Sequence, residues 1–95
     1  MALDDTLQCQ PARIVNRLGL HARAAARLAA LAGEYAAEIQ VSHQTHTANG
    51  KSIMGLMMLA AGQGSDIQVC ARGDDATAAL AALAALIADG FGEAD

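Results

Sequence analysis

Two side chains close together in residues 19–25, His21 and Arg23, could carry out covalent chemistry. The sequence Gly-Leu-His-Ala-Arg-Ala-Ala places His21 after a glycine turn, where a helix is expected to begin. A helix N-terminus offers N–H donors and a partial positive charge, which bind anions and disfavour a cationic histidine. His21 could therefore be a neutral nucleophile, and a phosphoryl group on its ring would meet the helix N–H groups and the Arg23 guanidinium. The alternative is a helix-capping or surface histidine.

Basic residues gather around this segment although the chain is acidic. The formal net charge is −4, yet residues 6–33 contain Arg13, Arg17, Arg23 and Arg27 and no acidic residue. One interpretation is a local positive surface for an anionic group or an acidic partner, and the other is chance clustering on a solvated face. The negative net charge argues against general nucleic-acid binding.

The length of 95 residues predicts one domain, residues 1–95, and an aromatic content of 2% means that aliphatic side chains and alanines must fill its core. Cys9 and Cys70 do not form a disulfide-rich framework, and we expect free thiols in a reducing cytosol. No apolar run approaches the length of a membrane span, and residues 1–10 lack the features of a signal peptide. The expected location is the cytoplasm, without insertion into a membrane.

Hydrophobic periodicity predicts the elements that must position His21. We expect strands at 8–15, 36–42, 45–48 and 67–72, helices at 22–32 and 53–60, and a last helix that starts near an N-capping Asp74 and is ended by Gly90. Pro11 cannot donate to a sheet ladder, so the first strand should be an edge strand. Residues 1–7 and 91–95 are expected to be loose ends.

This element order, β-α-β-β-α-β-α, predicts the α+β class. The strands alternate so that only one face of the sheet is apolar, which in the fourth strand turns Cys70 outward. We therefore expect an open-faced sandwich, in which three helices cover one face of a four-stranded, mainly antiparallel sheet.

Two further groups of side chains need an interpretation. Ser52 is a good N-cap for the short helix that follows it. That helix has more large apolar residues than one buried face can use, so we expect Met54 and Met57 to be partly exposed beside His21 as an adaptable docking patch.

His43 and His46 have the spacing of two metal ligands but no accompanying Cys or carboxylate cluster, and surface hairpin histidines are the better interpretation.

Two segments resemble the signatures of a known family. Asn-Arg-Leu-Gly-Leu-His-Ala-Arg-Ala-Ala at 16–25 is similar to the active-site segment of HPr, the histidine-containing phosphocarrier of the bacterial phosphoenolpyruvate-dependent phosphotransferase system. Asn-Gly-Lys-Ser-Ile-Met at 49–54 resembles the second HPr signature, and the element order also matches. The resemblance covers about residues 8–90 and implies the HPr fold.

The resemblance implies a role for each matching residue. His21 matches the histidine that carries phosphate on Nδ1, and Arg23 matches the arginine that stabilises the phosphoryl group. Ser52 matches the serine that an ATP-dependent kinase phosphorylates in some bacteria. Many members have proline after the arginine, where this chain has Ala24; alanine is also a strong helix former, but it adds an N–H and loosens the turn slightly.

The expected function is therefore that of a transiently phosphorylated carrier rather than a stand-alone enzyme, without cofactor or metal. Enzyme I would be the donor, a IIA domain or protein the acceptor, and an HPr kinase/phosphorylase a regulator of Ser52; we expect a monomer. The candidate partner-binding residues are Arg17, Ala22, Arg27, Ile53, Met54 and Met57.

Two other functions are compatible with parts of the sequence. A small α+β ligand-binding or interaction domain without phosphotransfer would need only the topology, but it leaves Arg23 and the arginine cluster unexplained. An enzyme with a histidine nucleophile would need a general base near His21, and none is apparent in the neighbouring sequence. Incubation with phosphoenolpyruvate and enzyme I would separate the three.

Overall fold

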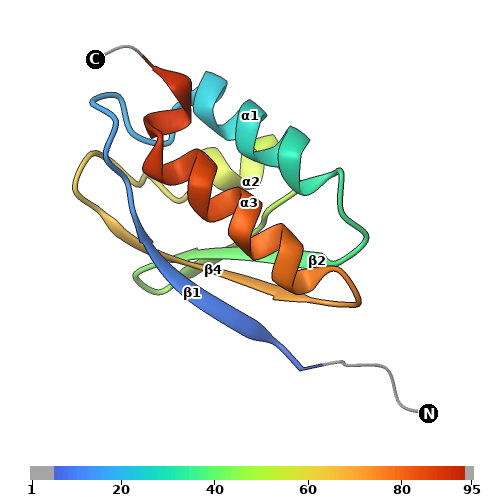
Figure 1. The fold of residues 1–95 in the computed structure, drawn as a ribbon. Helices are drawn as coiled ribbons and strands as arrows, with labels where there is room; N and C mark the ends of the chain where they lie inside the picture. Colours follow the sequence, from blue (N-terminus) through green and yellow to red (C-terminus); the bar gives the residue numbers. More distant parts are fainter. Residues whose placement is uncertain (1–5, 94–95) are drawn as a thin grey trace.

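The computed structural model describes residues 6–93, and it has the expected element order followed by one turn of 3₁₀-helix (Figure 1). The elements are β1 (Gln8–Arg13), α1 (Ala22–Ala32), β2 (Glu38–His43), β3 (His46–Asn49), α2 (Ile53–Met57), β4 (Asp66–Arg72), α3 (Ala76–Ala88) and the 3₁₀-helix η1 (Gly90–Gly92). The predicted α+β open-faced sandwich is confirmed. No helix among these elements is both long and apolar enough to cross a membrane.

The sheet has the strand order β1-β4-β2-β3, and each neighbouring pair is antiparallel. β1 is therefore an edge strand, as Pro11 predicted, since proline has no N–H to donate. Pro11 lies opposite Gln68 of β4, and within residues 6–93 β4 is the only strand that pairs with β1. The other edge is β3, which pairs with β2 through a hairpin.

The core lies between the sheet and the helices, which all cover the same face (Figure 1). Alternate residues of β2 and β4 point into it, as the period of two requires. The helices contribute leucines and many alanines, which allow their backbones to lie close to the sheet. The core includes Ile39, Val41, Ile67 and Val69 from the strands and Leu28, Leu56 and Leu83 from the helices, each at most 3% exposed.

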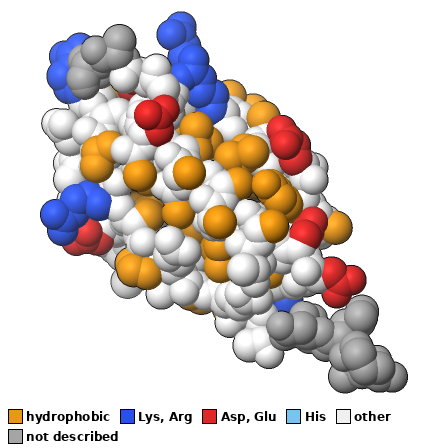
Figure 2. Space-filling model, viewed as in Figure 1, with side chains coloured by type: hydrophobic (Ala, Val, Ile, Leu, Met, Phe, Trp, Pro, Cys, Tyr) orange, Lys and Arg blue, Asp and Glu red, His pale blue; other side chains and the backbone are white. Residues whose placement is uncertain are grey.

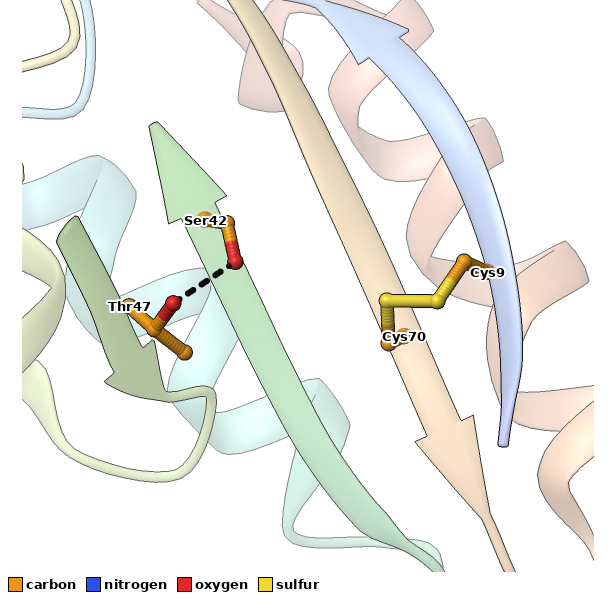
Figure 3. The surroundings of a disulfide bond; sticks show 4 residues. All are labelled: Cys9, Ser42, Thr47 and Cys70. Atoms are coloured by element: carbon orange, nitrogen blue, oxygen red, sulfur yellow. Dashed lines mark hydrogen bonds between the residues drawn. A yellow bond between two sulfur atoms is a disulfide. The ribbon is translucent and has the colours of Figure 1, made fainter. Parts of the chain in front are cut away.

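Cys9 and Cys70 form a disulfide between β1 and β4, so the expectation of free thiols is wrong for this structure (Figure 3). The strand register places the two residues directly opposite each other, with their Cα atoms 4.0 Å apart. Cys70 does point to the uncovered face, as the alternation predicts, but it is only 6% exposed. The sequence shows two cysteines far apart, and only the register of an antiparallel pair brings them together.

The N-terminus of α3 also differs from the prediction. Asp75, not Asp74, is the N-cap residue, and the helix begins at Ala76. The Asp75 carboxylate forms no capping hydrogen bond; instead it accepts hydrogen bonds of 2.8 Å each from the backbone N–H groups of Ala36 and Ala37. These bonds lower the pKa of Asp75, Ala36 having the largest effect. The carboxylate therefore fastens the connection between α1 and β2 to the start of α3.

Residues 91–93 were expected to be loose, and this prediction is wrong. Gly90, Phe91 and Gly92 have φ angles of 64°, 60° and 74°, so the chain reverses direction after α3. Phe91 is fully buried, and its carbonyl accepts a hydrogen bond from the Arg27 guanidinium. Burial of this side chain offsets the cost of a left-handed non-glycine residue. Residues 1–5 and 94–95, also expected to be loose, lie outside the described part of the chain.

Candidate functional site

The turn that leads to His21 is fixed by its contacts with the loop after α2. Gly19 has a φ of +68°, and a Cβ atom there would lie 2.6 Å from the carbonyl oxygen of Ala61. Leu20 donates its N–H to the same oxygen at 2.9 Å. Because no side chain fits at position 19, the glycine before His21 is a requirement of this close approach.

His21 is the N-cap residue of α1 but does not cap it with its side chain. Its extended backbone places its carbonyl to accept from the N–H of Ala25 at 2.8 Å, while the ring forms no capping hydrogen bond. The ring is 28% exposed. The helix-capping interpretation therefore fails for the side chain, and the ring remains accessible at a helix N-terminus.

The ring lies in an open depression of about 410 Å³ that three arginines also line. Arg23 is the second residue of α1, and Arg27 follows one helical turn later. The lining residues are Arg17, Leu18, His21, Arg23, Arg27, Gly92 and Glu93. In Figure 2, Lys and Arg side chains lie at the end of the molecule where η1 lies. The depression is therefore suited to an anionic group.

One member of the predicted arginine cluster is not part of this site. Arg13 lies on β1 and forms an exposed ion pair with Asp66 of β4, with Nε and Oδ1 3.0 Å apart. The other three come together because residues 16–27 form the turn and the first turns of α1. The positive surface thus contains three of the four arginines that the sequence predicted for it.

Two residues of the site, Glu93 and Asn16, were not among those predicted from the sequence. The Glu93 carboxylate contacts Nε2 of His21 and accepts a hydrogen bond of 3.0 Å from the Asn16 side-chain amide. Asn16 is only 3% exposed. A partial signal was present: Phe91 is the chain's one phenylalanine, and phenylalanine is among the residue types most often fully buried.

The apolar residues after Ser52 are exposed, as expected. Ser52 is the N-cap of α2, and its hydroxyl accepts from the N–H of Gly55 at 3.0 Å. Ile53, Met54 and Met57 are 45%, 73% and 42% exposed. α2 packs against α1, although these three residues do not line the depression itself. Ala22, the remaining candidate for partner binding, is also exposed.

The two hairpin histidines have different surroundings. Nδ1 of His43 forms a hydrogen bond of 2.8 Å with the carbonyl oxygen of Leu59, whereas His46 is exposed on β3. Within residues 6–93, no three His, Cys, Asp or Glu side chains are grouped in a way that could hold a metal ion.

The fold and the site together define a class: a small α+β sandwich that presents a histidine at a helix N-terminus among arginines. A family model described as "PTS HPr component phosphorylation site" matches residues 9–89. The chain therefore belongs to the HPr family of phosphotransferase-system proteins. Its function is that of a phosphocarrier in this system.

Individual relatives agree with this assignment. Phosphocarrier protein HPr of Cupriavidus necator is 49% identical over 82 residues, which are 86% of this chain and 92% of that protein. Phosphocarrier protein NPr of Shewanella violacea is 48% identical over 81 residues, 85% of this chain and 89% of that protein. The crystal structure of HPr-C-His from Thermoanaerobacter tengcongensis has a TM-score of 0.88 at 39% identity, and the match covers 93% of this chain and 99% of that one.

Proposed function

We propose that His21 carries the phosphoryl group, on Nδ1, between enzyme I and a IIA domain or protein. The observation that supports this most is the position of its ring, in an open depression lined by three arginines. At the start of α1, the phosphoryl oxygens would also meet backbone N–H groups that have no partner within the helix. The carrier needs no second nucleophile, since transfer runs between two proteins that each supply part of the site.

The test is incubation with phosphoenolpyruvate and enzyme I. We expect an adduct that is labile to acid and stable to base, and that His21→Ala abolishes. His46→Ala is the matched control, since it removes another accessible imidazole, and His43→Ala is a second control. Both control variants should still form the adduct. Labelling that persists in His21→Ala would refute the assignment.

Arg23 is proposed to act mainly on the phosphorylated state. A neutral imidazole gains little from a nearby guanidinium, whereas a phosphoryl dianion gains a charge-assisted hydrogen bond. At an exposed site, such a contact stabilises the phosphoryl group by roughly 1.5 kcal/mol, which corresponds to about a tenfold change in the rate of transfer. Arg23→Ala should therefore slow transfer and leave folding unchanged, while Arg13→Ala, outside the depression, should leave transfer unchanged. Normal transfer by Arg23→Ala in both directions would contradict this role.

Docking to both partners is proposed to be apolar at its centre and basic at its rim. Ile53, Met54 and Met57 would supply the centre, with Ala22 beside them; Arg17 and Arg27 would supply the rim. Met54→Glu should weaken association more than a rim substitution, because it places an unpaired charge in a desolvated centre.

Docking can be tested by titrating enzyme I into isotope-labelled protein. Leu7→Glu is the matched control, because Leu7 is 44% exposed and directly precedes β1, a strand that begins far from η1 (Figure 1). Amide shifts that cluster on the uncovered sheet face around Gln40 and Gln68 would contradict the interface. Association should weaken with salt, since the Debye length is about 8 Å at physiological ionic strength.

The remaining proposals concern regulation and context. Ser52 has a structural role as N-cap, and phosphorylation by an HPr kinase/phosphorylase is a second role, which incubation with ATP and such a kinase tests. We also propose that the protein is a monomer, which sedimentation tests. Its proposed location is the cytoplasm, which cell fractionation tests. Proteins named HPr and proteins named NPr are both among the relatives of this chain. The genes beside the one that encodes this chain would show whether the acceptor branch serves sugar uptake or regulation.

A further inference from the structure

The Glu93 carboxylate is held between two fixed partners. Its Oε2 contacts Nε2 of His21, and its Oε1 accepts from Nδ2 of Asn16 at 3.0 Å. Nδ2 of Asn16 also donates to the carbonyl oxygen of Gly19 at 2.8 Å, so both amide hydrogens are in use. The side chain of Glu93 is 13% exposed and that of His21 28%. The Asn16 amide cannot turn over without losing both of its hydrogen bonds.

We propose that Glu93 is a positioning residue for His21, which fixes the proton of the neutral ring on Nε2 and so leaves Nδ1 to accept the phosphoryl group. An ionised carboxylate can only accept a hydrogen bond, so the nitrogen that faces it must carry the proton. In a neutral imidazole with the proton on Nε2, the lone pair is on Nδ1. This inference rests on the proposed function of His21, and it adds the reason why one ring nitrogen rather than the other is the nucleophile.

The same contact stabilises the product of the step. The Nδ1 lone pair forms a bond to phosphorus, and the bond between phosphorus and the donor protein breaks with its electron pair remaining on the donor. The ring keeps its Nε2 proton and gains a positive charge, which the Glu93 carboxylate stabilises, as an orienting carboxylate does for an imidazolium elsewhere. Arg17, Arg23 and Arg27 line the same depression and offset the repulsion between this carboxylate and the phosphoryl oxygens.

The C-terminal turn is built to hold Glu93 in place. Phe91 is fully buried two residues before it, and the Arg27 guanidinium binds the Phe91 carbonyl. The family match ends at residue 89, so Glu93 lies beyond the matched segment. Burial of Phe91 and its hydrogen bond with Arg27 thus fix the segment that brings Glu93 to His21.

Two substitutions separate positioning from a merely structural role. In Glu93→Gln, the Asn16 amide still donates to the remaining side-chain oxygen at position 93. The new side-chain nitrogen at position 93 must then face His21 and donate a hydrogen bond to Nε2. That places the ring proton on Nδ1 and removes the nucleophile. In Glu93→Ala neither nitrogen is selected, and the two tautomers mix. Glu34→Gln is the matched control, since Glu34 is exposed just beyond the other end of α1.

The first measurement is the ¹⁵N chemical shifts of the His21 ring in the isolated protein at neutral pH. For the neutral ring we expect the proton on Nε2 in the native protein and in Glu34→Gln, shifts averaged between the two tautomers in Glu93→Ala, and the proton on Nδ1 in Glu93→Gln. The second is the rate of phosphorylation by enzyme I, which should fall in the order native, Glu93→Ala, Glu93→Gln, with Glu93→Gln at least about tenfold slower than native.

Two outcomes would overturn the proposal. One is a native ring pattern in both Glu93 variants. The other is faster transfer by the isosteric Glu93→Gln than by Glu93→Ala, which is the order expected if Glu93 only fills space. Urea unfolding of each variant shows whether the fold is retained. If even the native protein takes up no phosphate, the proposed function of His21 fails, while the ring shifts still decide the role of Glu93.

Discussion

In the oxidised protein, the Cys9–Cys70 disulfide should contribute a large part of the stability of this domain. The two residues are 61 positions apart, and closing a loop of that length removes about 14 cal/mol/K of chain entropy from the unfolded state, or about 4 kcal/mol at 25 °C. Typical disulfides contribute about 2–4 kcal/mol, so we expect a loss in this range on reduction. For a domain of 95 residues this corresponds to a fall in Tm of about 10–20 °C.

The assay is urea unfolding followed by circular dichroism, with and without dithiothreitol. Alkylation and mass measurement establish that two thiols are released. Cys9→Ala/Cys70→Ala should match the reduced protein and be insensitive to the reductant. The m-value should rise on reduction, because the unfolded chain loses a cross-link and exposes more surface. A fully reduced protein that keeps the unfolding midpoint of the oxidised one would refute the predicted contribution of the disulfide.

Three further predictions concern stability. Ser52→Ala should cost about 1 kcal/mol in urea unfolding, because it removes the hydrogen bond that caps α2, and Ser52→Asp should cost less. Phe91→Ala should cost about 3–5 kcal/mol by the same assay, since it leaves a cavity where the side chain is fully buried. The lowered pKa of Asp75 stabilises the fold above the unfolded value of about 3.9, and this contribution is lost as the pH falls through the folded value. Asp75→Asn should therefore weaken the acid dependence of the unfolding midpoint below about pH 4; an unchanged dependence would contradict the hydrogen bonds as its cause.

Local signals in the sequence predicted much of the fold. α1 has the expected bounds, because the turn before His21 and the glycine at position 33 mark its ends. Pro11 identified an edge strand. The inward residues of β2 and β4 follow from the period of two. Each of these features depends on neighbours in the sequence, which a periodicity can show.

The features that the sequence did not predict depend on contacts between distant residues. The disulfide requires the register of β1 against β4. The contact of Glu93 with His21 requires the chain to reverse after α3, and that reversal depends on a buried phenylalanine rather than on a turn motif. His21 and Arg23 were found from residue type and spacing, whereas the groups that orient the ring were not.

The turn after α3 has a practical consequence for making and degrading the protein. Because Phe91 belongs to the core and Glu93 to the depression, proteolytic trimming at Gly90 would remove both at once. A trimmed chain would then be less stable and would also lack the carboxylate that contacts His21. For recombinant work, an affinity tag is best fused before β1, which begins at the far end of the molecule from η1 (Figure 1).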